Sequence, residues 1–166
     1  ARALVACPVP VLAALAGHSP AGGCVLALCC DYRIMAEGPY RIGLNETQVG
    51  LVAPEGIQAL LARMVGAHRA ERLLVAGEMV DSAEALRIGL GDELTGIEEV
   101  ATRARIWLEG LLQLPRAPML QTRRIARVAA IDCLRDERIE LSRFVSGWMQ
   151  PDTQAALRAM LARIGK

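Results

Sequence analysis

Two glycine-bearing loops carry the residue types best suited to chemistry. The first, 17–23, reads Gly-His-Ser-Pro-Ala-Gly-Gly and leads into a run of small and apolar residues. If that run is a helix, its first backbone N–H groups lack intrahelical partners and carry the positive end of the helix dipole. N–H groups arranged in this way stabilise a developing oxyanion. The alternative is that Gly22 and Gly23 only allow a helix and a strand to approach closely.

The second loop, Gly43-Leu44-Asn45-Glu46, places one carboxylate in an apolar neighbourhood. Burial among apolar side chains raises the pKa of a carboxylate, and a glutamate in such a place is an effective proton shuttle near neutral pH. The alternative is that Glu46 is an exposed loop acid, because carboxylates are mostly solvated.

The remaining candidate groups are weaker. His18 could orient a substrate group or simply pack against the neighbouring strand, and His68 is assigned no catalytic role. The cysteines are odd in number, form no CxxC pair and have two histidines for company. Neither a disulfide framework nor a metal site is therefore expected, and reduced cysteines favour a cytoplasmic protein.

Composition excludes several functional classes. The 166 residues are 53% hydrophobic and carry a net charge of +1, which predicts a folded core and gives no electrostatic footprint for nucleic acid. Aromatic residues make up 3%, so stacking platforms for single strands are lacking. The apolar stretches fall far below the roughly 18 residues that a membrane-spanning helix needs.

The elements that must position the two loops form an α/β unit. A strand over 9–16, a helix over 24–30 and a strand over 31–36 predict a βαβ unit. Apolar residues at helical spacing after Pro54 predict an amphipathic helix that ends at Gly66. Two short helices follow, over 69–76 and over 83–88, the second capped by Ser82.

The chain is predicted to be helical from residue 95 onward. Thr95 and Glu98 match a capping box, and helices are expected over 119–130 and 152–164. Between these two lies a helix with apolar residues Leu134, Leu141, Phe144 and Trp148. The prediction is an α/β core over 1–94 and a helical region over 95–166 that serves oligomerisation.

Several segments together resemble the crotonase superfamily, and within it the Δ3,Δ2-enoyl-CoA isomerase branch. The segments that carry the resemblance are Ala13–Cys24, Cys30–Ala36, Ile42–Gln48, Val52–Pro54, Ala70–Arg72 and Ala83–Leu90. The resemblance implies a crotonase-like ββα spiral core, of which this chain holds the C-terminal portion, followed by helices that pack between subunits of a homotrimer. It also implies that the family's N-terminal strands, with a second oxyanion donor, precede this chain.

The resemblance also implies a reaction. An acyl-CoA thioester binds, and its carbonyl oxygen accepts hydrogen bonds from two backbone N–H groups. Loss of a C2 proton then gives an enolate. Gly22 falls on the position of one donor, Glu46 on the glutamate that acts as base and acid, and Asn45 on a substrate-contacting position. No metal or other cofactor is required, because coenzyme A is part of the substrate.

One departure from the hydratase pattern separates the possible reactions. Hydratases of this superfamily use a second glutamate two residues after the Gly-Gly pair, where this sequence has Val25. An aliphatic side chain cannot activate water, so the sequence favours isomerisation of a 3-enoyl-CoA to the 2-trans form in fatty-acid β-oxidation. A hydratase or other crotonase-type enzyme, and a truncated non-catalytic family member, remain alternatives.

A second departure lies after Ala53-Pro54. Typical isomerases carry aromatic residues there, and this sequence has Glu55-Gly56. Glu55 is either a second acid near the acyl chain or, in the simpler interpretation, a partner for the dipole of the helix that begins beside it.

Overall fold

The computed structural model describes residues 1–164. The core begins with short elements and the two candidate loops between them: α1 (Arg2–Val5), β1 (Leu12–Leu15), β2 (Ser19–Pro20), α2 (Gly22–Leu28), β3 (Tyr32–Ala36), β4 (Arg41–Gly43) and the 3-10 helix η1 (Glu46–Val49). It continues through α3 (Glu55–Val65), α4 (Ala67–Ala76), β5 (Val80–Asp81), α5 (Ser82–Ile88) and β6 (Glu93–Thr95). The helical region follows: η2 (Ile97–Glu99), α6 (Val100–Leu112), α7 (Arg116–Ala126), α8 (Val128–Asp132), α9 (Asp136–Ile139), α10 (Leu141–Trp148) and α11 (Pro151–Ile164).

The strands form two small sheets. In the first, β1 and β6 lie parallel on either side of β3, with Leu12 opposite Tyr32 and Ile34 opposite Glu93. Helix α2 connects β1 to β3, so the predicted βαβ unit is confirmed. In the second sheet, β4 pairs with β2 in parallel and with β5 in the antiparallel sense.

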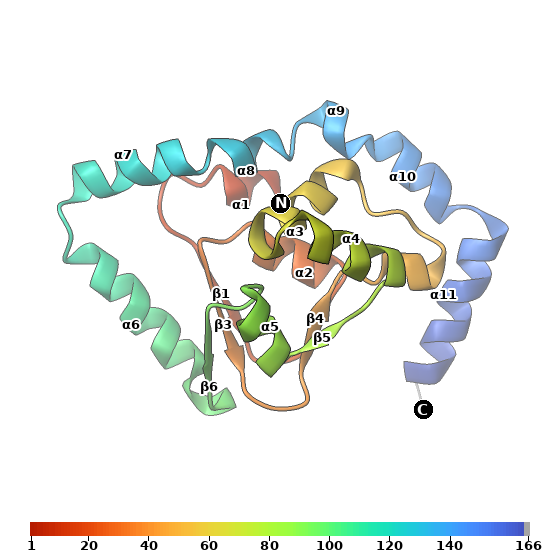
Figure 1. Cartoon of the computed structure of the whole chain (residues 1–166), viewed down its shortest axis with the longest axis horizontal. Coiled ribbons are helices and arrows are strands. Elements are labelled where there is room, and N and C mark those ends of the chain that lie inside the picture. The colour runs from red at the N-terminus through yellow and green to blue at the C-terminus, as the bar shows by residue number, and fades with distance from the viewer. Residues whose placement is uncertain (165–166) are drawn as a thin grey trace.

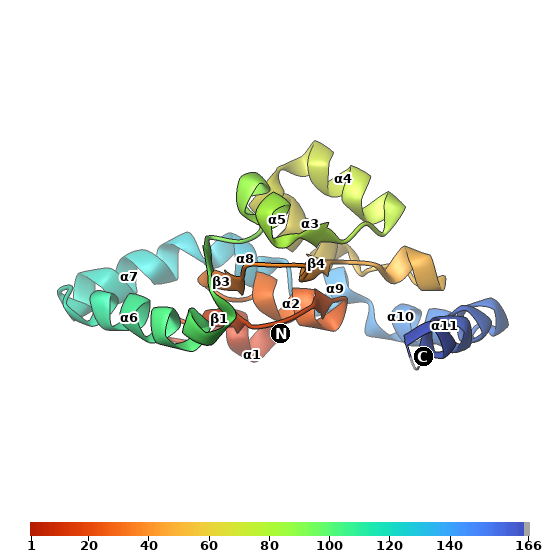
Figure 2. The same cartoon turned by 90° about the horizontal axis from the view of Figure 1, so that it is seen from below.

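The main core lies between α2 and the helices that follow the sheets. Figure 2 shows α3, α4 and α5 stacked over one side of the strands, whereas α2 lies at the level of the strands, and α2 contacts α3. The amphipathic pattern after Pro54 accounts for this packing, because it turns the apolar stripe of α3 toward α2 and the other helices that it contacts. The buried apolar side chains include Cys24, Leu28, Met35, Ile42, Ile57, Leu60, Leu61 and Leu90.

The helical region surrounds this core as a band. In Figure 1, α6 and α7 extend on one side of the core, α8 and α9 cross it, and α10 and α11 extend on the opposite side. Helix α6 packs on β1 and β3 through buried Val100 and Ala104, beside a stack of the Tyr32 and Trp107 rings with centroids 4.6 Å apart. The predicted order of an α/β core followed by helices is confirmed, although β6 spans the boundary predicted at residue 94.

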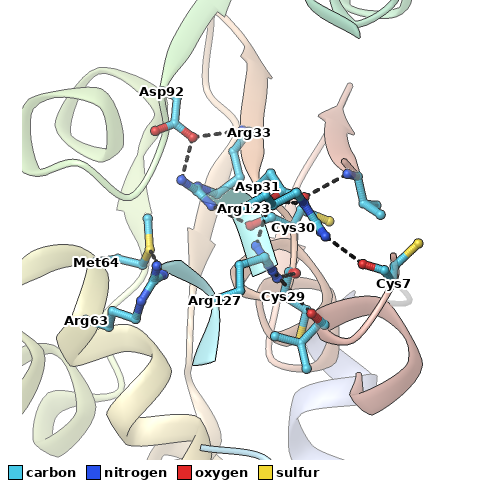
Figure 3. Close-up of polar contacts among 12 residues, drawn as sticks. Cys7, Cys29, Cys30, Asp31, Arg33, Arg63, Met64, Asp92, Arg123 and Arg127 are labelled. Carbon is cyan, nitrogen blue, oxygen red and sulfur yellow. Dashed lines mark hydrogen bonds and ion pairs between the residues drawn. The ribbon is translucent and has the colours of Figure 1, made fainter. Parts of the chain in front are cut away.

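A buried ionic cluster fastens the helical band to the core. The Asp31 carboxylate accepts two hydrogen bonds from Arg123, both 2.8 Å, and one from Arg127 at 3.0 Å (Figure 3). Arg127 also donates to the carbonyls of Val5 and Cys29. Asp31 lies between α2 and β3, so these contacts connect α7 and the α7–α8 junction to the βαβ unit.

A second buried ion pair holds β3. Arg33 is 2% exposed, and its guanidinium lies 2.5 Å from the Asp92 carboxylate, which also accepts the backbone N–H of Arg33 at 2.8 Å (Figure 3). The Arg33 Nε has no hydrogen-bond partner among the described residues. The pair joins β3 to the connector after α5, which places β6 beside β3.

Two predicted caps are wrong. The N-cap of α5 is Asp81, whose carboxylate accepts the N–H of Glu84 at 2.8 Å, whereas Ser82 lies inside the helix and donates to the carbonyl of Gly38. Thr95 does not cap a helix, because it ends β6, where it pairs with Ala36, and the residue that precedes η2 is Gly96. Its hydroxyl hydrogen bonds to Glu99, and α6 begins at Val100.

The predicted helices over 119–130 and through Leu134 to Trp148 are each interrupted. The first divides at Arg127 into α7 and α8, where the guanidinium turns inward to Asp31. The second divides at Glu140, whose backbone adopts φ +41°, and Leu134 lies before α9 as a buried residue outside any helix. Periodicity alone cannot find such breaks, because the apolar spacing continues across them.

Candidate active site

A two-residue ladder brings the two candidate loops together. Ser19 pairs with Ile42 and Pro20 with Gly43, and the N–H of Ala21 donates to the carbonyl of Gly43 at 2.9 Å. Both segments leave this parallel ladder in the same direction, one toward Gly22 and the other toward Glu46. Gly43 has to be glycine, because a Cβ there would lie 2.6 Å from the carbonyl oxygen of Glu78.

The first loop turns into α2 through an unusual backbone conformation at Ala21. This residue adopts φ +45° and ψ −114°, a region that L-residues other than glycine rarely occupy. Its carbonyl accepts the N–H of Val25 at 2.9 Å, the first hydrogen bond of α2. The N–H groups of Gly22 and Gly23 are therefore among those that the helix itself leaves without partners.

The two glycines differ in their surroundings. A Cβ on Gly23 would lie 2.9 Å from the Ser19 hydroxyl, so Gly23 does serve close packing. Gly22 has nothing within 4 Å of that position and is exposed. The packing alternative therefore fits Gly23, and Gly22 presents its backbone to open space.

Glu46 is buried at the start of η1. The residue is 9% exposed, and its Oε2 has no hydrogen-bond partner among the described residues. Burial raises the pKa of Glu46 above its ordinary value, and a backbone hydrogen bond offsets this only in part. The alternative of an exposed loop acid is therefore wrong.

A buried thiol lies near this carboxyl. Cys24, on the first turn of α2, is fully buried, and burial together with the negative charge of Glu46 raises the pKa of its thiol to about 12. Cys24 is therefore a neutral neighbour of Glu46 at physiological pH. Cys24 directly follows the glycine loop in sequence, and its buried thiol lies near the Glu46 carboxyl.

Glu46 faces a small hollow of about 200 Å³. The hollow is lined by apolar and uncharged residues apart from Glu46 itself: Leu44, Thr47, Val52, Ala53, Gln58, Leu74 and Val75. A larger hollow of about 580 Å³ shares Val52, Ala53 and Gln58 with it and extends toward α9 and α10. Glu46 thus opens on a small hollow with largely apolar walls, whereas the larger hollow beside it also carries charged side chains.

Other predicted positions take clear places. Asn45 is half-buried directly before η1, and Val25 is half-buried against the main core. Glu55 is the first residue of α3, is 71% exposed at its side chain and pairs with Arg138 at 2.8 Å. Glu55 is therefore an engaged surface acid at a helix start, as in the simpler interpretation.

His18 and the cysteines have structural surroundings. The His18 Nδ1 accepts the N–H of Arg41 at 3.1 Å, and its ring meets Tyr40 edge-on. All five cysteines are free, and burial raises the pKa of Cys29 to about 11. Within residues 1–164 there is no group of three or more His, Cys, Asp or Glu side chains placed to hold a metal ion. That same stretch contains no helix long and apolar enough to cross a membrane.

Residues other than the predicted site residues also hold the site together. Thr47 donates to the carbonyl of Leu74 at 3.2 Å, and Gln48 to that of Gly77 at 2.8 Å. From the C-terminal end, Thr153 donates to the carbonyl of Gly50 at 3.0 Å. Polar residues directly after Glu46 are a signal for the first two contacts, whereas nothing in the sequence points to Thr153.

Comparison with known proteins gives the relationship. The enoyl-CoA hydratase/isomerase family model matches residues 1–147. The chain is 37% identical to mouse (Mus musculus) mitochondrial enoyl-CoA delta isomerase 1 over 93% of this chain and 54% of the relative. It is 36% identical to a probable enoyl-CoA hydratase of Mycobacterium avium over 69% of this chain and 44% of the relative. The chain thus spans about half the length of the curated relatives that it matches.

The fold agrees with this relationship. The crystal structure of human mitochondrial delta3-delta2-enoyl-CoA isomerase superposes with a TM-score of 0.88 and 34% identity, covering 99% of this chain and 64% of that one. The predicted crotonase-like fold is confirmed. By its sequence and its fold, the chain belongs to the enoyl-CoA hydratase/isomerase family, in the crotonase superfamily.

Proposed function

We propose that this protein is an enoyl-CoA isomerase that moves the double bond of a 3-enoyl-CoA to the 2-trans position in fatty-acid β-oxidation. One observation carries the proposal: the buried carboxyl of Glu46, with a free Oε2, stands on a turn that is tied by backbone pairing to the glycine loop. A carboxylate held in this way is able to exchange protons with a substrate carbon without competing partners.

The chemistry follows from the roles that the family resemblance assigns. The thioester carbonyl oxygen accepts the N–H of Gly22, and Glu46 takes a proton from C2. The C–H electrons form the C1–C2 double bond of an enolate while the oxygen takes up the negative charge. Glu46 then delivers the proton to C4, where the C3–C4 π electrons form the new C–H bond. The C1–C2 π electrons form the C2–C3 double bond, and the electron pair on oxygen restores the thioester carbonyl. Glu46 ends ionised, so no cofactor is consumed, and Asn45 contacts the substrate.

The oxyanion donor and the general base contribute different amounts to the rate. Removal of one oxyanion donor in enzymes of this kind typically costs about 3 to 4 kcal/mol, and a general base contributes roughly 10²- to 10⁴-fold. The Gly22 donor belongs to the backbone, so a side-chain substitution does not remove it. Glu46 is therefore the position at which the proposal is tested.

Val25 favours isomerisation over hydration. It lies one residue after Cys24 on α2, at the position where the resemblance places the second glutamate of hydratases. Its aliphatic side chain packs partly into the core and provides no group that could take a proton from water. The similarity to a probable hydratase nevertheless makes hydration of a 2-enoyl-CoA the second candidate function.

The test is the conversion of a 3-enoyl-CoA to the conjugated 2-enoyl-CoA, followed by absorbance, with Glu46→Gln beside the wild type. We expect turnover in the wild type and a loss of at least about 100-fold in the variant. Water addition to a 2-enoyl-CoA, measured on the same preparation, separates the hydratase. Absence of both reactions in a folded chain that binds acyl-CoA weakly or not at all would favour the non-catalytic family member.

Assembly belongs to the same proposal. By resemblance the chain forms a homotrimer in which the C-terminal helices pack between subunits. Sedimentation of the purified chain tests this directly, with a trimer as the expected species.

A further inference from the structure

The turn that carries Glu46 is too short to hold its own shape. Helix η1 has four residues and no side-chain cap, and Asn45 before it makes no capping hydrogen bond. An isolated turn of this length is unstable in water, because fixing its backbone costs more than its few hydrogen bonds return. The position of Glu46 must therefore be fixed by contacts from other elements.

Two elements make these contacts. On the core side, Thr47 donates to the carbonyl of Leu74 in α4, and Gln48 donates to that of Gly77, which ends α4. From the far end of the chain, α11 packs against η1, and Thr153 donates to the carbonyl of Gly50, which ends the turn. Figure 1 shows α11 beside this turn at the edge of the molecule.

The contact from α11 is closely fitted. Thr153 is 2% exposed although it lies on a helix whose neighbouring residues Asp152 and Ala155 are exposed. Gly50 adopts φ +74°, and a Cβ there would lie 3.2 Å from the Thr153 hydroxyl. A buried threonine packed against a left-handed glycine indicates a specific docking point.

We infer that Thr153 is a positioning residue, through which helix α11 fixes the turn that carries Glu46 in place. The inference rests on the proposed function in that Glu46 is taken as the proton shuttle. Thr153, a residue far from Glu46 in sequence, thereby helps to set the pKa of the Glu46 carboxyl.

The groups around Glu46 make its pKa a sensitive measure of how firmly this turn is held. Cys24 on α2 is the titratable neighbour to which Glu46 is electrostatically coupled, and it is neutral. Gln58 on α3 and Leu74 and Val75 on α4 line the same hollow and carry no charge. Without a nearby charge on these described residues, entry of water is the change that would move the pKa of Glu46, and it would move it down toward the ordinary value.

The test replaces Thr153 by valine, which keeps the shape and loses the hydroxyl, and by serine, which keeps the hydroxyl. Thr102→Val, at an exposed threonine of α6, is the matched control. The carboxyl of Glu46 is titrated by carbon NMR in the full chain without substrate, and kcat is followed against pH with a 3-enoyl-CoA. We expect Thr153→Val to titrate Glu46 at lower pH, to move the acidic limb of the kcat profile in the same direction and to lower kcat roughly tenfold. Thr153→Ser and Thr102→Val should keep the wild-type titration.

A Glu46 titration in folded Thr153→Val that matches the wild type overturns the inference. Because the NMR titration needs no turnover, it decides the role of Thr153 even if the wild type is inactive, whereas an inactive wild type overturns the proposed function alone. If the valine variant does not fold, amide exchange in the wild type decides. The N–H of Leu51, bonded to the carbonyl of Glu46, and the N–H of Gln154 at the start of α11 should then open with the same free energy. Exchange of Gln154 from a state in which Leu51 stays protected contradicts the inference.

Discussion

At the scale of single residues, the buried carboxylate of Glu46 lowers the stability of the folded chain and has the raised pKa that the proposed proton transfer uses. Its carboxyl is buried, its Oε2 has no partner among the described residues, and its pKa is raised by burial. A raised pKa means that the folded state binds this proton more tightly than the unfolded state does. The ionised carboxylate that catalysis needs is thus the form that the fold tolerates least.

This asymmetry gives a pH-dependent stability prediction. We expect Glu46→Gln to be more stable than the wild type at pH 7 and to approach wild-type stability as pH falls below the ordinary glutamate pKa, where the carboxyl is protonated in both states. Urea unfolding at several pH values checks this. A stability difference that stays constant across that pH range would show that the carboxylate is not destabilised by burial.

The Arg33–Asp92 pair gives a second prediction at this scale. Asp92→Ala should lower the free energy of unfolding by about 3 to 5 kcal/mol, because it leaves the buried Arg33 guanidinium without its carboxylate. The matched control is Glu109→Ala, which breaks an exposed pair with Arg105 and should change stability by less than about 1 kcal/mol. Thermal unfolding of the two variants distinguishes the buried pair from the exposed one.

At the scale of elements, the site depends on close approaches that only glycine permits. Helix α3 passes so near the C-terminal band that a Cβ on Gly56 would lie 1.7 Å from the carbonyl oxygen of Cys133. Gly77, which ends α4 with φ +60°, would likewise place a Cβ 2.5 Å from the Thr47 hydroxyl. Both positions set how α3 and α4 sit against their neighbours.

We therefore expect Gly56→Ala to be strongly destabilising, by roughly 3 kcal/mol or more, because backbone on both sides must move. Gly110→Ala is the control, since Gly110 lies in α6 with nothing within 4 Å of the place that an added methyl group would take. That control should be stabilised by about 0.5 to 1 kcal/mol through helix propensity. Equal effects in the two variants would contradict the close packing of α3 on the C-terminal band.

The sequence predicts those elements whose signal is local. The βαβ unit and the helix after Pro54 are found because apolar spacing and turn residues agree there, and the candidate loops follow from their residue types. The two-residue strands β2 and β5 are missed, since their pairing is decided by contacts between distant segments. The contact of Thr153 is missed for the same reason, and the breaks at Arg127 and Glu140 are hidden by an apolar spacing that continues through them. The burial of Glu46 follows from the apolar neighbourhood of its loop, although the sequence alone leaves the exposed alternative open.

At the scale of the whole molecule, the helical band is attached to the core through charge as well as apolar packing. Asp31 receives Arg123 and Arg127 in a cluster that is largely buried. Burial by itself would raise the pKa of Asp31, but hydrogen bonds from Arg123 and Val11 and the two positive charges outweigh it and lower that pKa below its ordinary value. A lowered pKa means that this attachment contributes stability above the unfolded pKa and loses it as pH falls through the folded value.

We expect Asp31→Asn to lower the free energy of unfolding by about 3 kcal/mol at pH 7 and the difference from the wild type to shrink in strong acid. Asp136→Asn, at a side chain that is 84% exposed and pairs with Arg2, is the control and should have little effect. Acid titration followed by circular dichroism checks both. A deficit in Asp31→Asn that persists unchanged in strong acid would count against a pH-dependent attachment.

The hydrogen bond between Thr153 and Gly50 has a consequence for biosynthesis. Its two ends are 103 positions apart, and one of them lies in the last helix that the structure describes. A ribosome delivers Glu46 and the glycine loop, together with the strands that pair them, well before it delivers α11. The turn that holds the carboxyl can therefore be completed only after α11 has emerged, so that a partly made polypeptide carries the motifs of the site before it carries the finished site.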